Sequence, residues 1–298
     1  MKIEPIKLKD CLLSAAIGDI CGSPWEFASF KGLTLEGFRK SMKFDYSDPN
    51  NNGYSPLLEH CNMEILRLPH PPFATDDSIC TFAIAEAVID GTDIEKNLVR
   101  RCLEEINRGY GPMFVKWLLD ENRQPYNSYG NGSAMRCSIA GWFANSIDEA
   151  KKIAEATAAP SHNHPEGIKG AVAAAKALYR ARKGWSKEDV ADGIFDFYPE
   201  NWRTMSWQDI LDNYKFDVTC QGSLPVVAMA IRDSSDFEDC ILRCIQSGGD
   251  CDTLGAIAAP IAYAIYREMP DYMLEVAHKY LPKWCLEINE KFNKLNGF

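Results

Sequence analysis

Three short acidic segments stand out because each places carboxylates beside small residues. They are residues 18–26 (GDICGSPWE), 74–78 (ATDDS) and 248–253 (GGDCDT), and the last two each precede an apolar run. Asp, Ser and Thr are preferred residues at helix N-caps, and an anion in the first turn stabilises a helix by about 0.3–1 kcal/mol. Helix capping is therefore the simplest interpretation of either of these two segments taken alone.

Capping needs one such residue, whereas the second and third segments each supply two carboxylates and a threonine. Several carboxylates at the start of a buried helix are unfavourable without a counter-charge, and residues 74–93 and 246–266 contain no Lys or Arg. Hard divalent cations such as Mg²⁺ or Mn²⁺ bind carboxylate and hydroxyl oxygens. Together with Glu26, the two segments offer enough oxygens for two ions, which at roughly 3.5–4 Å apart could activate a water molecule. No HxxxH or paired-cysteine pattern accompanies them, which disfavours zinc.

Two further segments combine glycines or histidines with helix-start signals. Residues 128–136 (SYGNGSAMR) contain a turn whose backbone N–H groups could bind phosphate oxygens, although a turn without a ligand is the simpler interpretation. Tyr129 could stack on a base or ribose, or belong to the core. Residues 161–167 (SHNHPEG) could bind a metal, a phosphate or a ribose, or could cap a helix that begins at Pro165.

Helices are the elements that must position these groups. Apolar periodicity and end signals predict helices over residues 79–89, 94–106, 167–182 and 254–266, and the last of these is expected to be buried on all sides. No convincing period-2 strand is present, so the fold class is all-α, with residues 1–298 as a single domain. Residues 45–56 are turn-forming and predict a loop, which could be a lid or a plain surface loop. Residues 198–207 predict a loop with aromatic plugs.

Composition excludes several classes of protein. The 298 residues are 46% hydrophobic and carry a formal net charge of −10, which argues against a nucleic-acid partner because phosphate binding needs a basic surface. Eleven scattered cysteines without a CxxC pair, and an N-terminus without an apolar run, favour a reducing, cytoplasmic location. The longest apolar stretch, residues 254–266, is too short to span a bilayer. We expect a monomer without a membrane partner.

The five motifs GDxxGSPxE, TDDS, SYGNGxAMR, SHxHPEGIKGA and SGGDxDT, in this order from residue 18 to about residue 266, resemble the ADP-ribosylglycohydrolase family. The resemblance implies a compact multi-helix orthogonal bundle with a binuclear Mg²⁺ or Mn²⁺ centre in a central cleft. Asp19 matches a position of the family motif, and we interpret it as structural support within its helix, with Gly18 and Gly22 allowing close packing. The implied metal ligands are Thr75, Asp76, Asp77, Asp250, Asp252 and Thr253. The implied substrate-binding residues are Ser128, Tyr129, Gly130, Asn131, Gly132 and His162.

The resemblance also implies an activity. It predicts a metal-dependent hydrolase that removes ADP-ribose from a modified acceptor, either a protein side chain such as arginine or serine or a small molecule, by cleaving the bond at the anomeric carbon. Glu26 matches the glutamate that the family places near the metals, and it would be either a ligand or the residue that moves the proton; Asp77 is the other candidate for proton transfer. Two alternatives stay open: a binuclear-metal hydrolase of free nucleotides or ADP-ribose derivatives, and a non-enzymatic relative that binds ADP-ribose or is structural.

Overall fold

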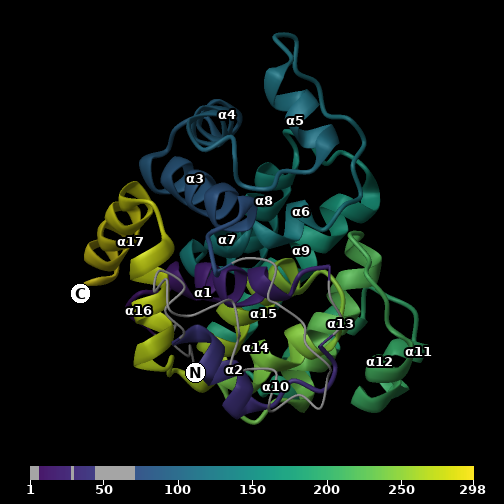
Figure 1. Cartoon of the computed structure of the whole chain (residues 1–298). Helices are drawn as coiled ribbons and strands as arrows, with labels where there is room; N and C mark the ends of the chain where they lie inside the picture. Colours follow the sequence, from purple (N-terminus) through teal and green to yellow (C-terminus); the bar gives the residue numbers. More distant parts are fainter. Residues whose placement is uncertain (1–6, 28–29, 44–70) are drawn as a thin grey trace.

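The computed structural model describes residues 7–27, 30–43 and 71–298, and within these ranges regular structure consists of helices alone (Figure 1). An isolated bridge between Gly130 and Thr219 is the nearest feature to a strand there. The all-α prediction is confirmed. The helices are α1 (Leu13–Gly22), η1 (Ser23–Trp25), α2 (Leu35–Met42), α3 (Asp76–Asp90), α4 (Ile94–Glu104), α5 (Pro112–Leu119), α6 (Gly132–Met135), α7 (Ser138–Phe143), α8 (Ile147–Ala158), α9 (Pro165–Arg182), α10 (Lys187–Phe195), α11 (Asn201–Thr204), α12 (Trp207–Asn213), α13 (Cys220–Asp233), α14 (Phe237–Gln246), α15 (Cys251–Tyr266), α16 (Asp271–Tyr280) and α17 (Lys283–Asn296).

Helices α1 and α15 pack against each other in the middle of the molecule (Figure 1). Their backbones touch: a Cβ atom added at Gly18 would lie 2.1 Å from the carbonyl oxygen of Gly255, and one added at Gly22 would lie 2.6 Å from the Cα of Asp252. No side chain fits at either position, so glycine is required for the contact. The expected close packing at Gly18 and Gly22 is therefore present, and it sets α1 against the first turn of α15.

Helix α1 also fixes the start of α3 through Asp19, which is fully buried. The Asp19 carboxylate accepts hydrogen bonds from the backbone N–H of Thr75 (3.0 Å), the hydroxyl of Thr75 (2.7 Å), the backbone N–H of Ser78 (3.1 Å) and the hydroxyl of Ser78. Thr75 is the N-cap of α3, and its hydroxyl accepts from the backbone N–H of Asp77. One buried carboxylate thus satisfies backbone donors that the first turn of a helix leaves free.

All four predicted helices are observed, as α3, α4, α9 and α15, with some changes at their ends. Helix α3 ends at Gly91 in the left-handed conformation, as expected, and α15 is buried along nearly its whole length. The helix predicted over residues 94–106 stops at Glu104, so Ile106 lies beyond it and is 37% exposed. The loop prediction for residues 198–207 is wrong in part, because the short helix α11 forms within it. The predicted 45–56 loop lies outside the described residues.

Two findings bear on the expected setting of the chain. The ten cysteines in the described ranges are all free and buried. None of the helices seen there combines the length and the apolar character that a membrane span requires.

The contact between α1 and α15 leads to a prediction on stability. We expect Gly18→Ala to lower the free energy of unfolding by about 2 kcal/mol or more, because the new methyl group must push the Gly255 backbone away. Urea unfolding followed by circular dichroism measures the change. Gly111→Ala is the matched control, because the space around that glycine is open. Equal unfolding midpoints for Gly18→Ala and the unmodified protein would contradict the account of this helix contact.

Candidate active site

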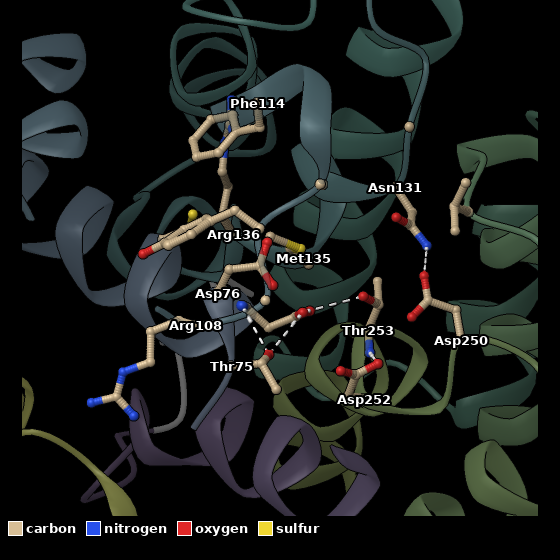
Figure 2. Close-up of a pocket in the computed structure, with 18 of the residues that line it drawn as sticks. Thr75, Asp76, Arg108, Phe114, Asn131, Met135, Arg136, Asp250, Asp252 and Thr253 are labelled. Carbon is tan, nitrogen blue, oxygen red and sulfur yellow. Dashed lines mark hydrogen bonds between the residues drawn. The ribbon is translucent and has the colours of Figure 1, made fainter. Parts of the chain in front are cut away.

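A cavity of about 500 Å³ opens where the five motifs meet (Figure 2). Helices α3 and α15 start at the floor of this cavity. Residues 128–132, which we call the glycine turn, precede α6 and form one wall. Sequence-predicted residues from every motif line it: Glu26, Thr75, Asp76, Asp77, Ser128, Gly130, Asn131, Gly132, His162, Asp250, Asp252 and Thr253.

Two groups of carboxylates converge at the floor of the cavity. Asp19, Asp77 and Asp252 form one group, and Glu26, Asp250 and Asp252 form the other. Within each group, one oxygen of every member lies within 4.8 Å of the others. Asp252 belongs to both groups, so the two groups are adjacent.

Hydroxyl and amide groups hold these carboxylates in place. The hydroxyls of Thr75 and Thr253 lie 3.3 Å and 3.2 Å from Oδ2 of Asp77, which joins the starts of α3 and α15. The side-chain amide of Asn131 donates to Oδ2 of Asp250 at 2.8 Å and to the hydroxyl of Ser223 at 3.0 Å. In Figure 2, Thr75 and Asp76 at the start of α3 lie to the left of Asp252 and Thr253 at the start of α15.

Burial and mutual repulsion dominate the electrostatics of the floor. Burial raises the pKa of Asp19 to about 6, although its hydrogen bonds with Ser78 and Thr75 oppose the rise. Burial and then the charge of Asp250 raise the pKa of Glu26 to about 7. Burial and then neighbouring carboxylates raise the pKa of Asp77 and of Asp252 well above the usual range.

Positive side chains near the cavity do not neutralise this charge. Among the described residues, no Lys or Arg forms an ion pair with either carboxylate group. Arg108 pairs with Glu105 instead, and its guanidinium points away from the carboxylates in Figure 2. Arg136 donates to backbone carbonyls and to Ser161.

The donor set fits divalent cations. It consists of carboxylate and hydroxyl oxygens, which hard cations prefer. In addition, Oδ1 of Asp77 is buried and has no hydrogen-bond partner, so it is an acceptor without a donor inside the described structure. Two ligand groups that share Asp252 offer room for two ions.

Asp76 stands apart from both groups. It lines the cavity at the start of α3, and its backbone N–H donates to the carbonyl of Arg108 at 2.8 Å. Its Oδ1 faces Gly109, at 3.9 Å from where a Cβ of that glycine would lie. Burial and then the charges of Asp19 and Asp250 raise its pKa to about 8. Its predicted role as a ligand stays a prediction.

The glycine turn uses part of its hydrogen-bonding capacity internally. The N–H of Gly130 donates to the Ser128 hydroxyl at 3.2 Å, and the N–H of Asn131 donates to the carbonyl of Val218 at 2.8 Å. Tyr129 is 47% exposed and is not among the residues that line the cavity. Its ring lies 5.3 Å from that of His164, so its predicted contact with the substrate stays a prediction.

The two histidines of the fifth motif have different roles. His164 is the N-cap of α9 and accepts from the backbone N–H of Glu166 at 3.1 Å, as the capping interpretation predicts. His162 lines the cavity and is 4% exposed. Burial, followed by the nearby charge of Arg136, lowers its pKa well below the usual range, so the ring is neutral.

Sequence reasoning missed several residues of this site. Asp19 was assigned a supporting role, yet its oxygens also join a carboxylate group; the GDxxG motif was the available signal. The bond between Asn131 and Asp250 had no signal in the sequence. The rim carries Phe27, which is 78% exposed and stacks on Phe216 with 5.2 Å between ring centroids. Nothing in the spacing of these two aromatic residues predicted their contact.

Comparisons with known proteins agree with this geometry. The family model described as ADP-ribosylglycohydrolase matches residues 4–296. An uncharacterized protein of Archaeoglobus fulgidus is 26% identical, with 90% of each chain covered. The ADP-ribosylhydrolase ARH3 of Gallus gallus is 23% identical, with 89% of this chain and 86% of that protein covered. A solved structure titled ADP-ribosylglycohydrolase-related protein complex superimposes with a TM-score of 0.67 at 20% identity, covering 96% of this chain and 95% of the other.

The raised pKa values predict how stability depends on pH and on cations. The pKa values of about 6, 7 and 8 for Asp19, Glu26 and Asp76 lie above those of the same groups in an unfolded chain. The folded protein therefore loses stability as the pH rises from about 4, where the unfolded carboxyl groups ionise, to about 8, where all three are ionised in both states. With a chelator present, we expect the unfolding temperature to fall between about pH 4 and pH 8. Excess Mn²⁺ or Mg²⁺ should raise it by roughly 5 °C at the upper end.

Differential scanning fluorimetry over this pH range measures both effects. Asp252→Asn serves as the comparison, because it removes the carboxylate that both groups share and should flatten the response to the cation. An unfolding temperature that is insensitive to cations at every pH would contradict the metal-centre interpretation.

Proposed function

The chain belongs to the ADP-ribosylglycohydrolase family, and on this premise we propose that it is a metal-dependent hydrolase that releases ADP-ribose from a modified acceptor. The acceptor is a protein side chain such as arginine or serine, or a small molecule. The bond between the anomeric carbon and the acceptor atom breaks, and a bond from that carbon to a water oxygen forms. One hydrogen of the water stays on the new hydroxyl group of the ribose. The other passes to a carboxylate and from there to the acceptor, which leaves protonated.

One observation carries this proposal: Asp252 belongs to both carboxylate groups on the floor of a cavity that also reaches the glycine turn and His162. The cavity therefore combines an anionic, oxygen-rich end with a second end that bears neutral donors. A substrate with ribose hydroxyls near one end and a pyrophosphate near the other matches this division. Binding energy at the pyrophosphate would position the reacting carbon over the carboxylates.

Two divalent cations fit the floor. We infer that Thr75, Asp76, Asp77, Asp250, Asp252 and Thr253 would hold them, with Asp19 beside the first group and Glu26 beside the second. When bound, Mg²⁺ or Mn²⁺ would supply positive charge that favours ionisation of water and binding of hydroxyl groups. The choice of ion and the count of two belong to this proposal.

The settings of Glu26 and Asp77 differ, which supports a division of labour between them. Asp77 is buried, and the hydroxyls of Thr75 and Thr253 fix its Oδ2, as suits a stationary ligand. Glu26 is only partly buried and lines the cavity beside the exposed Phe27. We therefore assign the proton transfer to Glu26 and metal binding to Asp77.

Other expectations accompany this proposal. Residues 1–298 would act as one domain and as a monomer in the cytoplasm, with an ADP-ribosylated protein or small molecule as partner. The family match across residues 4–296 supports the single domain.

The proposal predicts that Asp252→Asn reduces the rate of hydrolysis by more than about 100-fold. Substitution of a residue that only supports a metal ligand typically lowers activity by about 10–100-fold, and loss of a ligand itself should have a larger effect. Release of ADP-ribose is measured by chromatography from a panel of ADP-ribosylated arginine, ADP-ribosylated serine and free nucleotides, with and without chelator. Asp212→Asn, an exposed aspartate of α12, is the control. Wild-type turnover by Asp252→Asn, or activity that a chelator leaves intact, would refute the metal-dependent mechanism.

A second prediction separates Glu26 from Asp77. Glu26→Gln should lower kcat by about 100-fold or more while Mn²⁺ still binds, because a proton carrier is removed. Asp77→Asn should instead weaken Mn²⁺ binding, because a ligand is removed. Isothermal titration with Mn²⁺, combined with steady-state kinetics, makes the comparison. The assignment fails if Glu26→Gln keeps its kcat, or if Asp77→Asn binds Mn²⁺ normally and loses only kcat.

A further inference from the structure

A chain of hydrogen bonds runs behind the glycine turn, outside the carboxylate floor. It begins at Arg136, which is 1% exposed and has no acidic partner among the ion pairs of the described residues. Its Nη2 donates to the carbonyl of Thr157 at 3.0 Å and to the hydroxyl of Ser161 at 2.8 Å. These bonds hold Ser161 against the end of α8.

The direction of the next bond follows from the chemistry of the donors. A guanidinium group can only donate, so the Ser161 oxygen must accept from Arg136. The same oxygen lies 2.8 Å from Nδ1 of His162, and these two are the partners that the described structure gives it. The Ser161 hydrogen then has one available acceptor, which is Nδ1. The opposite arrangement would leave a buried hydroxyl hydrogen without an acceptor.

The remaining hydrogen of His162 must therefore be on Nε2. The ring is neutral, as its burial and its lowered pKa indicate, so it carries one N–H group. Nε2 lies against the glycine turn, 3.6 Å and 3.7 Å from where Cβ atoms of Gly132 and Gly130 would be. No described residue accepts a hydrogen bond from it, although His162 lines the cavity.

We propose that Arg136 and Ser161 are positioning residues that fix His162 as the Nε2–H tautomer, so that it presents a hydrogen-bond donor to a phosphate oxygen of a nucleoside diphosphate ligand. This inference rests on the proposed function for the identity of the ligand. It assigns His162 to binding and excludes it as the proton acceptor of the reaction, because Nδ1 is occupied and Nε2 already carries hydrogen.

Serine substitutions test the positioning role with ADP-ribose as the probe. We expect Ser161→Ala to weaken ADP-ribose binding and raise KM by about 10-fold, with kcat within about twofold of the unmodified enzyme, because a donor in the binding site loses its orientation. Ser161→Thr keeps the hydroxyl and should restore both constants. Ser234→Ala is the matched control, because Ser234 is also fully buried but lies outside the cavity lining. Thermal unfolding confirms that each variant is folded.

The tautomer itself is read by ¹⁵N NMR of the whole protein labelled at histidine. The His162 signal is assigned by its loss in His162→Gln. In the unmodified protein, with or without ADP-ribose, we expect a protonated Nε2 and an unprotonated Nδ1, and in Ser161→Ala a mixture of both tautomers. His162→Gln, which can place an amide donor where Nε2 lies, should bind ADP-ribose more tightly than His162→Asn.

Several outcomes would overturn the positioning role. One is a protonated Nδ1 in the unmodified protein. Another is a Ser161→Ala variant that keeps the Nε2–H tautomer, whether or not binding weakens, because the hydroxyl would then have only a packing role. Failure of the proposed function looks different: ADP-ribosylated substrates would not be cleaved, yet the tautomer of the free protein and its response to Ser161→Ala would still decide this inference.

Discussion

The structure depends on keeping several carboxylates close together in a buried place without basic partners. Asp77, Asp250 and Asp252 are each at most 5% exposed, and no described Lys or Arg pairs with them. Like charges at this spacing repel strongly in a medium less polar than water. The chain opposes this repulsion with hydroxyl and amide donors and with the positive ends of two helices. The negative charge that these groups leave uncompensated would attract the divalent cations that we propose.

The supports of the floor come from different parts of the chain. Helix α1 contributes the Asp19 carboxylate, which ties the first turn of α3, and the two glycines that admit the first turn of α15. The glycine turn contributes Asn131, which holds Asp250. Each ligand-bearing turn is therefore fixed by a segment distant in sequence. This arrangement explains why the motifs have little meaning singly and a specific meaning together.

Local signals in the sequence were sufficient for much of the fold. Gly91 ends α3 as the sequence predicts, because capping depends on neighbouring residues alone. The helix begins at Asp76, three residues before the predicted start, because the capping residue lies within the acidic segment itself. The end of α4 was misplaced because the apolar stripe continues to Ile106 although the helix does not. Within the site, the motifs identified many of the residues that line the cavity, including the carboxylates of its floor, but not the aromatic residues Phe27 and Phe216. The bond between Asn131 and Asp250 spans 119 positions and depends on tertiary packing, as does the outward position of Tyr129, so neither could be predicted from local patterns.

The contact between Gly18 and Gly255 has a mechanical consequence. Where side chains separate two helices, a change of rotamer or of residue size can shift their spacing by small steps. Here the backbones of α1 and α15 are in direct contact at Gly18 and Gly255, so no side chain between them can change its conformation to alter their spacing. Asp19 is next to one glycine, and Asp252 lies one helical turn before the other. The spacing of the backbone at Asp19 and Asp252, whose carboxylates share one group, is thus set by direct main-chain contact. Substitutions elsewhere in the core can accumulate without changing this spacing.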